Sequence, residues 1–475
     1  MKGWGFVGAS YTLPTTAIAD EECFNRYLET LETPGAQTRM ALLDAPGYVV
    51  FATLPEGPVR GSCKINGRVF VVGGSKLCEL NSDGSFTARG AVENDGLPAS
   101  LAASNVEVLI VSGLKAYSLL LADNTLIEVT DQLAGKPVQV EYDDTYFIVS
   151  FQNSNKFQFS DVLDGRTWPG INVNAVSVFA DNIVSIKASH RELWVWGNQH
   201  CQPYYDSGSS EVFDVISGAF IETGSAATFG AQRADNTSFW VHEDERGARM
   251  CWRASGYTPM RISTHAVEYD LSSYGSISNL VSYVYQDSGH AFWILYIPGS
   301  QWSWCYDVAQ SAWTKRAEWD ETDAVWGAHQ SWNHVYAFGK HLVGDWKTAN
   351  IYDLSRNYID NNGAVLRRLR RSPTIGNELQ WMTFQSFIID YMTGVGPQPP
   401  LVDGAGNPRE PMSMLRWSDD RGQNWSNEHT CGMGMAGDDL IRVIFWRLGR
   451  SRYRVWEESV TDPVRSDILD AYINS

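Results

Sequence analysis

The residues best suited to chemistry are nine histidines and several carboxylate pairs, and their spacing argues against a reaction centre. His329 and His334 lie five residues apart, and His341 follows them. On a strand this odd spacing turns the first two rings to opposite faces, so the pattern does not predict a metal site. We interpret His265 and His290 as hydrogen-bonding or packing residues at strand edges and turns.

The carboxylate pairs also argue against a reaction centre. Neighbours such as Asp143-Asp144 and Asp419-Asp420 would point to opposite faces of a strand, which makes them turn residues. The sequence has no nucleophile elbow, phosphate-binding glycine loop or dinucleotide fingerprint. We therefore predict that the protein is not an enzyme and that it has no catalytic residue, cofactor or metal.

The seven cysteines are scattered, odd in number and never spaced as Cys-x-x-Cys. This pattern favours free buried thiols made in a reducing compartment over a disulfide framework or a zinc site. The N-terminal residues lack an apolar signal segment, and no run of 18 apolar residues exists that would predict a membrane anchor.

One motif has a recognisable turn chemistry. The segment from Ser418 to Trp425 approximates the Asp-box, Ser-x-Asp-x-Gly-x-Thr-Trp, with Asn424 in place of Thr. It predicts a structural turn in which Asp420 accepts backbone N–H groups, Gly422 takes a positive φ and the Trp packs beneath. Because the motif is common in sialidase propellers, a glycan-binding or sialidase-like β-propeller is the alternative function.

Arg367, Arg368, Arg370 and Arg371 form one basic run in a chain of net charge −18. A solvated loop, a contact with an acidic neighbouring chain and a contact with DNA phosphates are the three interpretations that remain open. We choose the protein interface as the candidate role. The overall negative charge argues against tight binding of a nucleic-acid backbone.

The elements that position these residues are β-strands. Only residues 20–31, with acidic residues in a possible first turn, are a fair helix candidate. Elsewhere a strand–turn–strand unit recurs about every 45 residues, which predicts an all-β fold with a propeller of six or seven blades. The seven candidate units begin at Arg68, Val106, Thr145, Glu192, Ser238, Ala291 and His334.

The sequence changes in composition after the repeats, which predicts that the chain has three structural parts. Residues 1–56 are expected to form an N-terminal extension that packs on the propeller or on a neighbouring subunit. Residues 57–365 form the β-propeller. Residues 366–475, which include a Pro/Gly-rich loop at 394–411, form a smaller C-terminal β-rich domain or closing segment.

The chain resembles the packaged-DNA stabilisation, or tail hub (nozzle), proteins of short-tailed bacteriophages of the podovirus, lambdoid type. The resemblance covers most of the chain and rests on turn and strand residues rather than a catalytic signature. It departs from the family pattern at Arg26, Leu28 and Asp144-Thr145. The similar segments are residues 22–29, 45–47, 57–61, 159–168, 261–268, 285–292, 306–313, 417–420 and 447–452.

This resemblance implies a structural virion protein, assembled in the host bacterial cytoplasm, that closes the head after genome packaging. It implies a homo-oligomeric ring, a hexamer, beside the portal adaptor or head–tail connector. Tailspikes or tail fibres and a plug or needle are the other implied partners. Genomic double-stranded DNA would pass through the channel without sequence readout. We expect acidic residues to face that channel and the basic run to face elsewhere.

Overall fold

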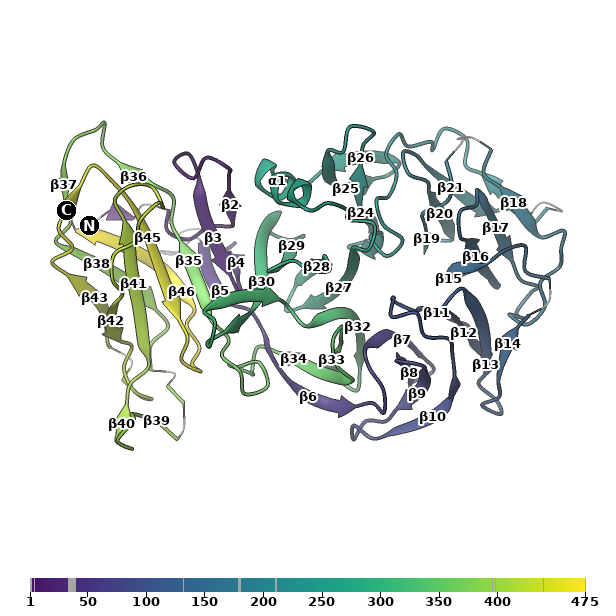
Figure 1. Ribbon diagram of the computed structural model, residues 1–475, viewed down its shortest axis with the longest axis horizontal. Helices are drawn as coiled ribbons and strands as arrows, with labels where there is room; N and C mark the ends of the chain where they lie inside the picture. The colour runs from purple at the N-terminus through teal and green to yellow at the C-terminus, as the bar shows by residue number, and fades with distance from the viewer. Residues whose placement is uncertain are drawn as a thin grey trace.

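Seven sheets surround a common centre and form a β-propeller, and a β-sandwich lies beside it (Figure 1). Both chain ends lie on the sandwich. The computed structural model describes residues 2–3, 5–32, 40–130, 132–177, 181–209, 212–394, 396–397, 399–438 and 440–474. The fold is therefore all-β with a propeller and a second β domain, as the sequence predicts.

The first five blades each use four consecutive antiparallel strands, listed here from the inner to the outer strand. The first contains β7 (Val59–Ile65), β8 (Arg68–Gly73), β9 (Lys76–Leu80) and β10 (Phe86–Ala91). The second contains β11 (Ser100–Ala103), β12 (Glu107–Ser112), β13 (Lys115–Leu120) and β14 (Leu126–Val129). The third contains β15 (Pro137–Asp143), β16 (Tyr146–Phe151), β17 (Lys156–Phe159) and β18 (Val173–Ala175). The fourth contains β19 (Ser185–Ser189), β20 (Glu192–Trp196), β21 (Cys201–Asp206) and β22 (Phe213–Val215), and the fifth contains β23 (Gln232–Ala234), β24 (Thr237–Glu243), β25 (Arg249–Ser255) and β26 (Thr258–Arg261).

The last two blades connect the propeller to distant parts of the chain. The sixth contains β27 (Val281–Asp287), β28 (His290–Tyr296), β29 (Ser303–Asp307) and β30 (Ala312–Asp320), with β31 (Val325–Ala328) paired to β30. The seventh contains β32 (Ser331–Ala337), β33 (Lys340–Asp345) and β34 (Asn350–Ser355). Its outer strand is β6 (Gly47–Thr53), so an N-terminal strand closes the ring.

Contacts between the inner strands decide the blade number. Each inner strand contacts the next around the ring, in the order β7, β11, β15, β19, β23, β27 and β32, and β32 contacts β7. The circle is complete with seven blades, so the alternative of six is excluded.

Period-two apolar patterns fill the spaces between blades. In β8, Val69 and Val71 belong to the core shared with the seventh blade. Phe70 and Val72 belong to the core shared with the second blade. A blade sheet with two apolar faces is stable only between two neighbours, which explains the closed ring.

The sandwich has two layers. One contains β4 (Arg26–Thr30), β5 (Met40–Asp44), β46 (Ile468–Asn474), β38 (Ser386–Tyr391) and β43 (Val443–Trp446), with β1 (Lys2–Gly3) paired to β46. The other contains β3 (Asp20–Phe24), β35 (Arg368–Arg371), β45 (Tyr453–Val460), β41 (Met412–Ser418) and β42 (His429–Gly432), with β2 (Tyr11–Thr12) and β36 (Ile375–Gly376) at its side. Two short pairs complete the domain, β37 (Met382–Thr383) with β44 (Arg450–Ser451) and β39 (Leu401–Val402) with β40 (Pro408–Arg409).

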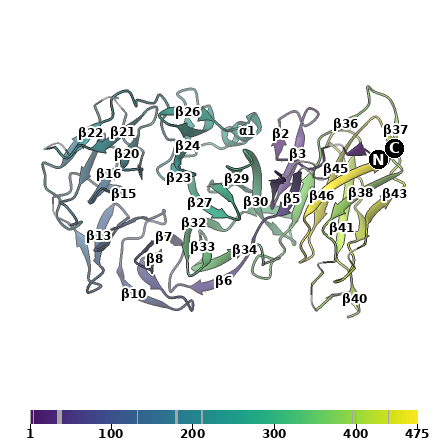
Figure 2. The ribbon, with the colours of Figure 1, turned by 180° about the vertical axis from the view of Figure 1, so that it is seen from behind.

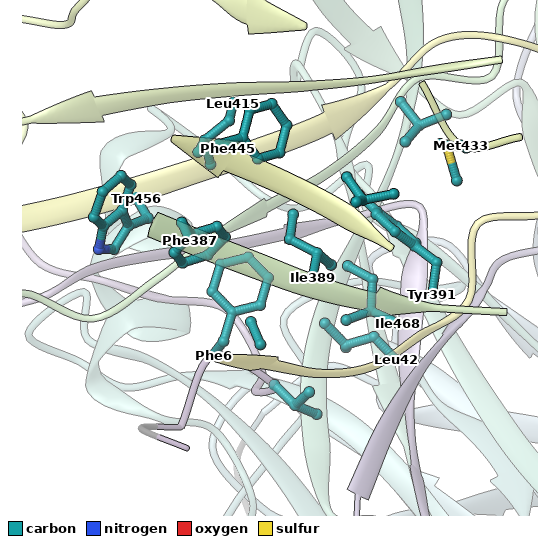
Figure 3. Close-up of a cluster of buried hydrophobic side chains, with 14 of the residues drawn as sticks. Phe6, Leu42, Phe387, Ile389, Tyr391, Leu415, Met433, Phe445, Trp456 and Ile468 are labelled. Carbon is teal, nitrogen blue, oxygen red and sulfur yellow. The ribbon is translucent and has the colours of Figure 1, made fainter. Parts of the chain in front are cut away.

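An aromatic core lies between the two layers (Figure 3). The rings of Phe387 and Trp456 stack with centroids 4.8 Å apart, and Phe6 meets Phe387 edge-on at 5.6 Å. Leu42 and Ile468 extend the same core and are fully buried. The two ends of the chain therefore share one core.

One sheet runs through both bodies. β3 pairs in parallel with β30 of the sixth blade and antiparallel with β35 of the sandwich. The sixth blade therefore continues through β3 and β35 into β45 and β41 (Figures 1 and 2). We call this region, the sheet from β30 to β41 together with the strands β4 and β5 that face it, the junction.

The helix expected at residues 20–31 is wrong, because this segment forms β3 and β4. Asn25 between the two strands has φ 53°, and its side chain bonds to Ala317 and to the Arg367 carbonyl. Asp20 and Glu22, two of the acidic residues that suggest a first helical turn, are instead ion-pair partners across the sheet. Glu22, for example, pairs with Lys315 at 2.7 Å.

The one α-helix in the described ranges is α1 (His265–Ser273). Thr264 caps it by accepting a hydrogen bond from the Val267 amide, and Val267 and Leu271 are buried one turn apart. His265 therefore begins a helix and is exposed, so the strand-edge position that the sequence predicts for it is wrong. The threonine cap and the four-residue apolar spacing were the missed signals.

Residues 1–56 are divided between the two bodies. Strands β3, β4 and β5 enter the sandwich, whereas β6 enters the propeller. Within the expected loop at 394–411, residues 395 and 398 lie outside the described residues, and β39 and β40 form a hairpin.

Candidate functional site

The basic run lies on β35, in the middle of the junction. Alternate residues of a strand point to opposite faces, so Arg368 and Arg370 share one face and Arg367 and Arg371 the other. Arg368 and Arg370 are each only 1% exposed. These two guanidinium groups face the interior of the sandwich.

A carboxylate from the opposite layer lies beside Arg368. Arg368 Nε lies 3.0 Å from Asp44 Oδ2, and Asp44 also lies 3.4 Å from Arg26 Nε. Arg26 forms a two-pronged ion pair with Glu458 and bonds to the Ser466 hydroxyl at 3.1 Å. Neither Arg26 nor Glu458 has an exposed side-chain atom. This is a buried charge network between the two layers, in which each arginine lies beside a carboxylate.

Arg370 is held by backbone oxygens. It donates hydrogen bonds to the carbonyls of Phe6, Ala9 and Glu22 at 2.6, 3.0 and 3.2 Å. Burial lowers its pKa below the ordinary arginine value, and the nearby acidic groups oppose that change. Arg370 therefore ties the N-terminal segment to the junction.

The opposite face carries a ladder of alternating charges. Arg371 lies 2.9 Å from Asp20 and 2.7 Å from Glu457, and Arg416 lies 2.5 Å from Glu457. Burial raises the pKa of Asp20 to about 6, although the Arg371 guanidinium opposes the rise. The Trp425 ring lies between Arg371 and Arg416, with its centroid 4.8 and 4.9 Å from the two guanidinium carbons.

Arg367 differs from its neighbours, because no carboxylate of the described chain lies within ion-pair distance of it. Its guanidinium stacks on Trp319 at 4.1 Å, and its buried Nε has no hydrogen-bond partner. It lines a hollow of about 610 Å³ on this outer face of the sheet.

The expected role of the whole run at an interface with another chain needs correction. Arg368 and Arg370 are used inside the molecule, and Arg371 is paired there with Asp20 and Glu457. The run is a strand that joins two domains of one chain, not a solvated loop. The sequence could not reveal this, because the partner carboxylates lie on distant strands. Only Arg367 remains available to another molecule.

The Asp-box residues form a tight turn between β41 and β42. Ser418 donates a hydrogen bond to Asp420 at 2.7 Å, and the Gly422 amide donates to Ser418 at 2.8 Å. The Asn424 amide donates to Asp420 at 2.8 Å, and this bond is the main cause that lowers the Asp420 pKa to about 2. Gly422 has φ 93°. The turn lies in the sandwich, away from the propeller blades.

The histidines are structural where their contacts are described. His290 is buried between Asp307 and Glu29, with both nitrogen–oxygen distances 2.7 Å. Burial lowers the pKa of His329 and of His334 to about 3, which keeps both rings neutral. His334 and His341 stack with centroids 5.3 Å apart.

No three metal-ligating side chains gather within the described ranges. All seven cysteines are unpaired, as predicted. Among the same residues, no helix has the length and apolar character that crossing a membrane requires.

The propeller centre holds a polar hollow of about 290 Å³ lined by the inner strands. Two of its basic groups are paired, Arg60 with Asp95 and Lys187 with Glu141 at 2.8 Å. The volume is at the lower limit of small-ligand pockets, which span roughly 300–1,000 Å³.

Two family models match this arrangement. The model described as "Bacteriophage P22 Gp10, beta-propeller" matches residues 16–359. The model described as "Bacteriophage P22 Gp10, beta-sandwich" matches residues 367–475. The chain belongs to the bacteriophage P22 Gp10 family. It is therefore a structural protein of a phage virion, and the resemblance seen in the sequence is confirmed.

Searches beyond the family add little to this assignment. No curated protein matches the chain significantly. Among solved structures, the N-terminal domain of Nup159 is 12% identical with a TM-score of 0.43, covering 71% of this chain and 99% of its own. The propeller domain of Cps50 (Swd1) from Myceliophteria thermophila is 8% identical with a TM-score of 0.42, covering 65% of this chain and 99% of its own. The family is not known for enzymes, which agrees with the absence of a recognisable catalytic motif.

Proposed function

We propose that this protein is a tail hub or nozzle subunit that closes the phage head after genome packaging and retains the packaged DNA. Membership of the P22 Gp10 family is the observation that carries the proposal. The adaptor below the portal, the tailspikes or fibres and a plug or needle are its proposed neighbours in the tail.

The small propeller centre bears on the route of the DNA. Each inner strand contacts the next around the ring, which leaves little room at the centre, and we propose that the duplex passes outside each single chain. Several copies arranged as a ring would enclose such a route, and we propose a hexamer. The net charge of −18 supports a channel wall that repels phosphates, because each bound phosphate would add a salt-dependent barrier to ejection.

Packaged heads assembled without the protein test this function. With a nonsense allele of its gene, we expect full heads to lose their DNA and the DNA to become sensitive to nuclease. Purified protein should restore nuclease resistance, whereas heat-denatured protein should not. Heads that keep their DNA without the protein would contradict the proposal.

The glycan-binding alternative loses its main support in the structure. The single Asp-box turn lies in the sandwich, next to Arg371 and Arg416, and not in a propeller blade. We expect no hydrolysis of a fluorogenic sialoside by the purified protein.

A further inference from the structure

A hollow on the outer face of the junction has the composition of a binding site for a peptide segment. We call it the Arg367 hollow. Its volume is about 610 Å³, roughly twice that of the propeller centre. Apolar side chains from β3, β35 and β41 form its floor. The β30–β31 hairpin supplies two tryptophans of its wall, and the third comes from the turn before β29. The floor and wall residues are Phe24, Leu369, Met414, Trp302, Trp319 and Trp326.

The wall is held rigidly by ring contacts. Phe24 and Trp326 stack with centroids 4.3 Å apart, and Trp319 meets Trp326 at 4.9 Å. Lys315 fixes Trp302 from below, with its ammonium 4.0 Å from the ring centroid. Ordered tryptophans beside an arginine are the residues that dominate binding energy in protein interfaces.

Arg367 is the one cation of this hollow that is left without a carboxylate. Arg371 and Arg416 also line it, but Glu457 pairs with both of them. Arg367 is only 8% exposed, and its Nε has no hydrogen-bond partner. A buried charge without a partner is costly, and a bound anion would remove that cost. Burial lowers the pKa of Arg367, and Arg416 and Arg371 lower it further, while Glu457 and Glu428 oppose the change.

We propose that the Arg367 hollow binds a segment of another protein that places a carboxylate against Arg367 and an apolar side chain against the tryptophan wall. A planar guanidinium binds a carboxylate through two parallel hydrogen bonds, which fixes the direction of the bound segment. The inference does not rest on the proposed role in DNA retention.

DNA fits this hollow less well than a peptide does. Phosphate backbones are held by several cations at once, whereas one unpaired cation is present here. Glu22 and Glu428 line the same hollow and would repel a chain of phosphates. A single carboxylate followed by an apolar group carries less negative charge and meets less of that repulsion.

A matched pair of small probes tests the proposal on the full chain. The probes are 3-phenylpropionate and its neutral analogue 3-phenylpropionamide, and ligand-observed NMR measures their binding. We expect the carboxylate to bind about tenfold more tightly than the amide, the effect of one charge-assisted hydrogen-bonded contact. Arg367→Gln should abolish this difference. Arg246→Gln, a substitution at an exposed arginine of the propeller, should preserve it.

Three outcomes would overturn the inference. One is that the two probes bind equally tightly, or that neither probe binds. Another is an unchanged preference in Arg367→Gln, with circular dichroism showing both variants folded. The third concerns a short DNA duplex. If it displaces the carboxylate from the wild type and binds more weakly to Arg367→Gln, the hollow is a phosphate site.

Discussion

The propeller and the junction are stabilised by different physical means. Between blades the contacts are mostly apolar, as between Phe70 of the first blade and Ile110 of the second. At the junction the buried contacts are charged, with Arg26, Arg368 and Arg371 each facing a carboxylate. The propeller buries apolar side chains against one another, whereas the junction buries charged side chains against opposite charges.

The difference concerns specificity as much as stability. Apolar blade contacts tolerate small shifts, whereas an arginine between two carboxylates accepts one alignment. A buried ion pair adds little net stability, but removing one partner leaves a buried charge unpaired. We infer that these ions fix how the two layers of the sandwich align, and that the ion pair of Lys315 on β30 with Glu22 on β3 sets the sandwich against the sixth blade.

The largest expected effect comes from breaking the central ion pair. Glu458→Gln removes the charge that faces Arg26 and keeps the side-chain size. Because both groups are fully buried, we expect the free energy of unfolding to fall by about 4 kcal/mol. Urea denaturation followed by tryptophan fluorescence measures the change.

An exposed ion pair is the control for this prediction. Asp235 and Arg253 are 53% and 34% exposed, so Asp235→Asn should change stability by less than about 1 kcal/mol. The double variant Arg26→Met, Glu458→Leu should recover much of the lost stability, since it leaves no unpaired charge. Equal losses in Glu458→Gln and Asp235→Asn would remove the contrast between junction and surface.

A cavity in a blade core should lower the free energy of unfolding slightly less than Glu458→Gln does. Leu109 is fully buried between the second and third blades, and Leu109→Ala leaves a cavity there. We expect a loss of about 3 kcal/mol in the same urea titration. Unlike the junction variant, it should not be rescued by a second charge change. A loss below that of Asp235→Asn would show that the blade cores are not closely packed.

The stability lost on replacing His290 should be smaller and should depend on pH. The hydrogen bond to Asp307 is the main cause that raises the His290 pKa above 6.5; Glu29 adds to the rise, and burial opposes it. A raised pKa means that this stabilisation is complete below pH 6.5 and is lost as the pH rises through the higher folded-state value. His290→Gln should therefore cost roughly 1–2 kcal/mol on the acid side and less on the alkaline side. A difference from wild type that grows with pH would contradict this sign.

The smallest effect is expected at the Asp-box turn. Asp420→Ala removes the acceptor of the Asn424 amide, in an exposed loop. We expect faster hydrogen exchange at Asn424 and an unchanged melting temperature. A large drop in melting temperature would mean that the turn supports the sandwich core and not only its own loop.

The propeller could be predicted from sequence because its units are local. Each hairpin joins neighbouring residues, so strand, turn and strand appear together, as at Arg68 and Lys76. The seventh unit is an exception, because its outer strand β6 comes from a distant part of the chain. Sequence period alone therefore left the blade number open.

The junction could not be predicted, because its partners are remote in sequence. Arg26 pairs with Glu458, and Arg371 with Asp20, and neither spacing has any local signal. The basic run looked like a surface patch for the same reason. The stacking of Arg367 on Trp319 depends on a hairpin from the sixth blade, which no pattern near residue 367 indicates.

Differential scanning calorimetry of the intact chain tests the central claim most directly, namely that the shared sheet and buried ions make one unit of propeller and sandwich. If propeller and sandwich unfold as one unit, we expect a single transition whose calorimetric and van't Hoff enthalpies agree. In Glu458→Gln the transition should move to lower temperature and split. Two resolved transitions in the wild type, one for each domain, would contradict the account.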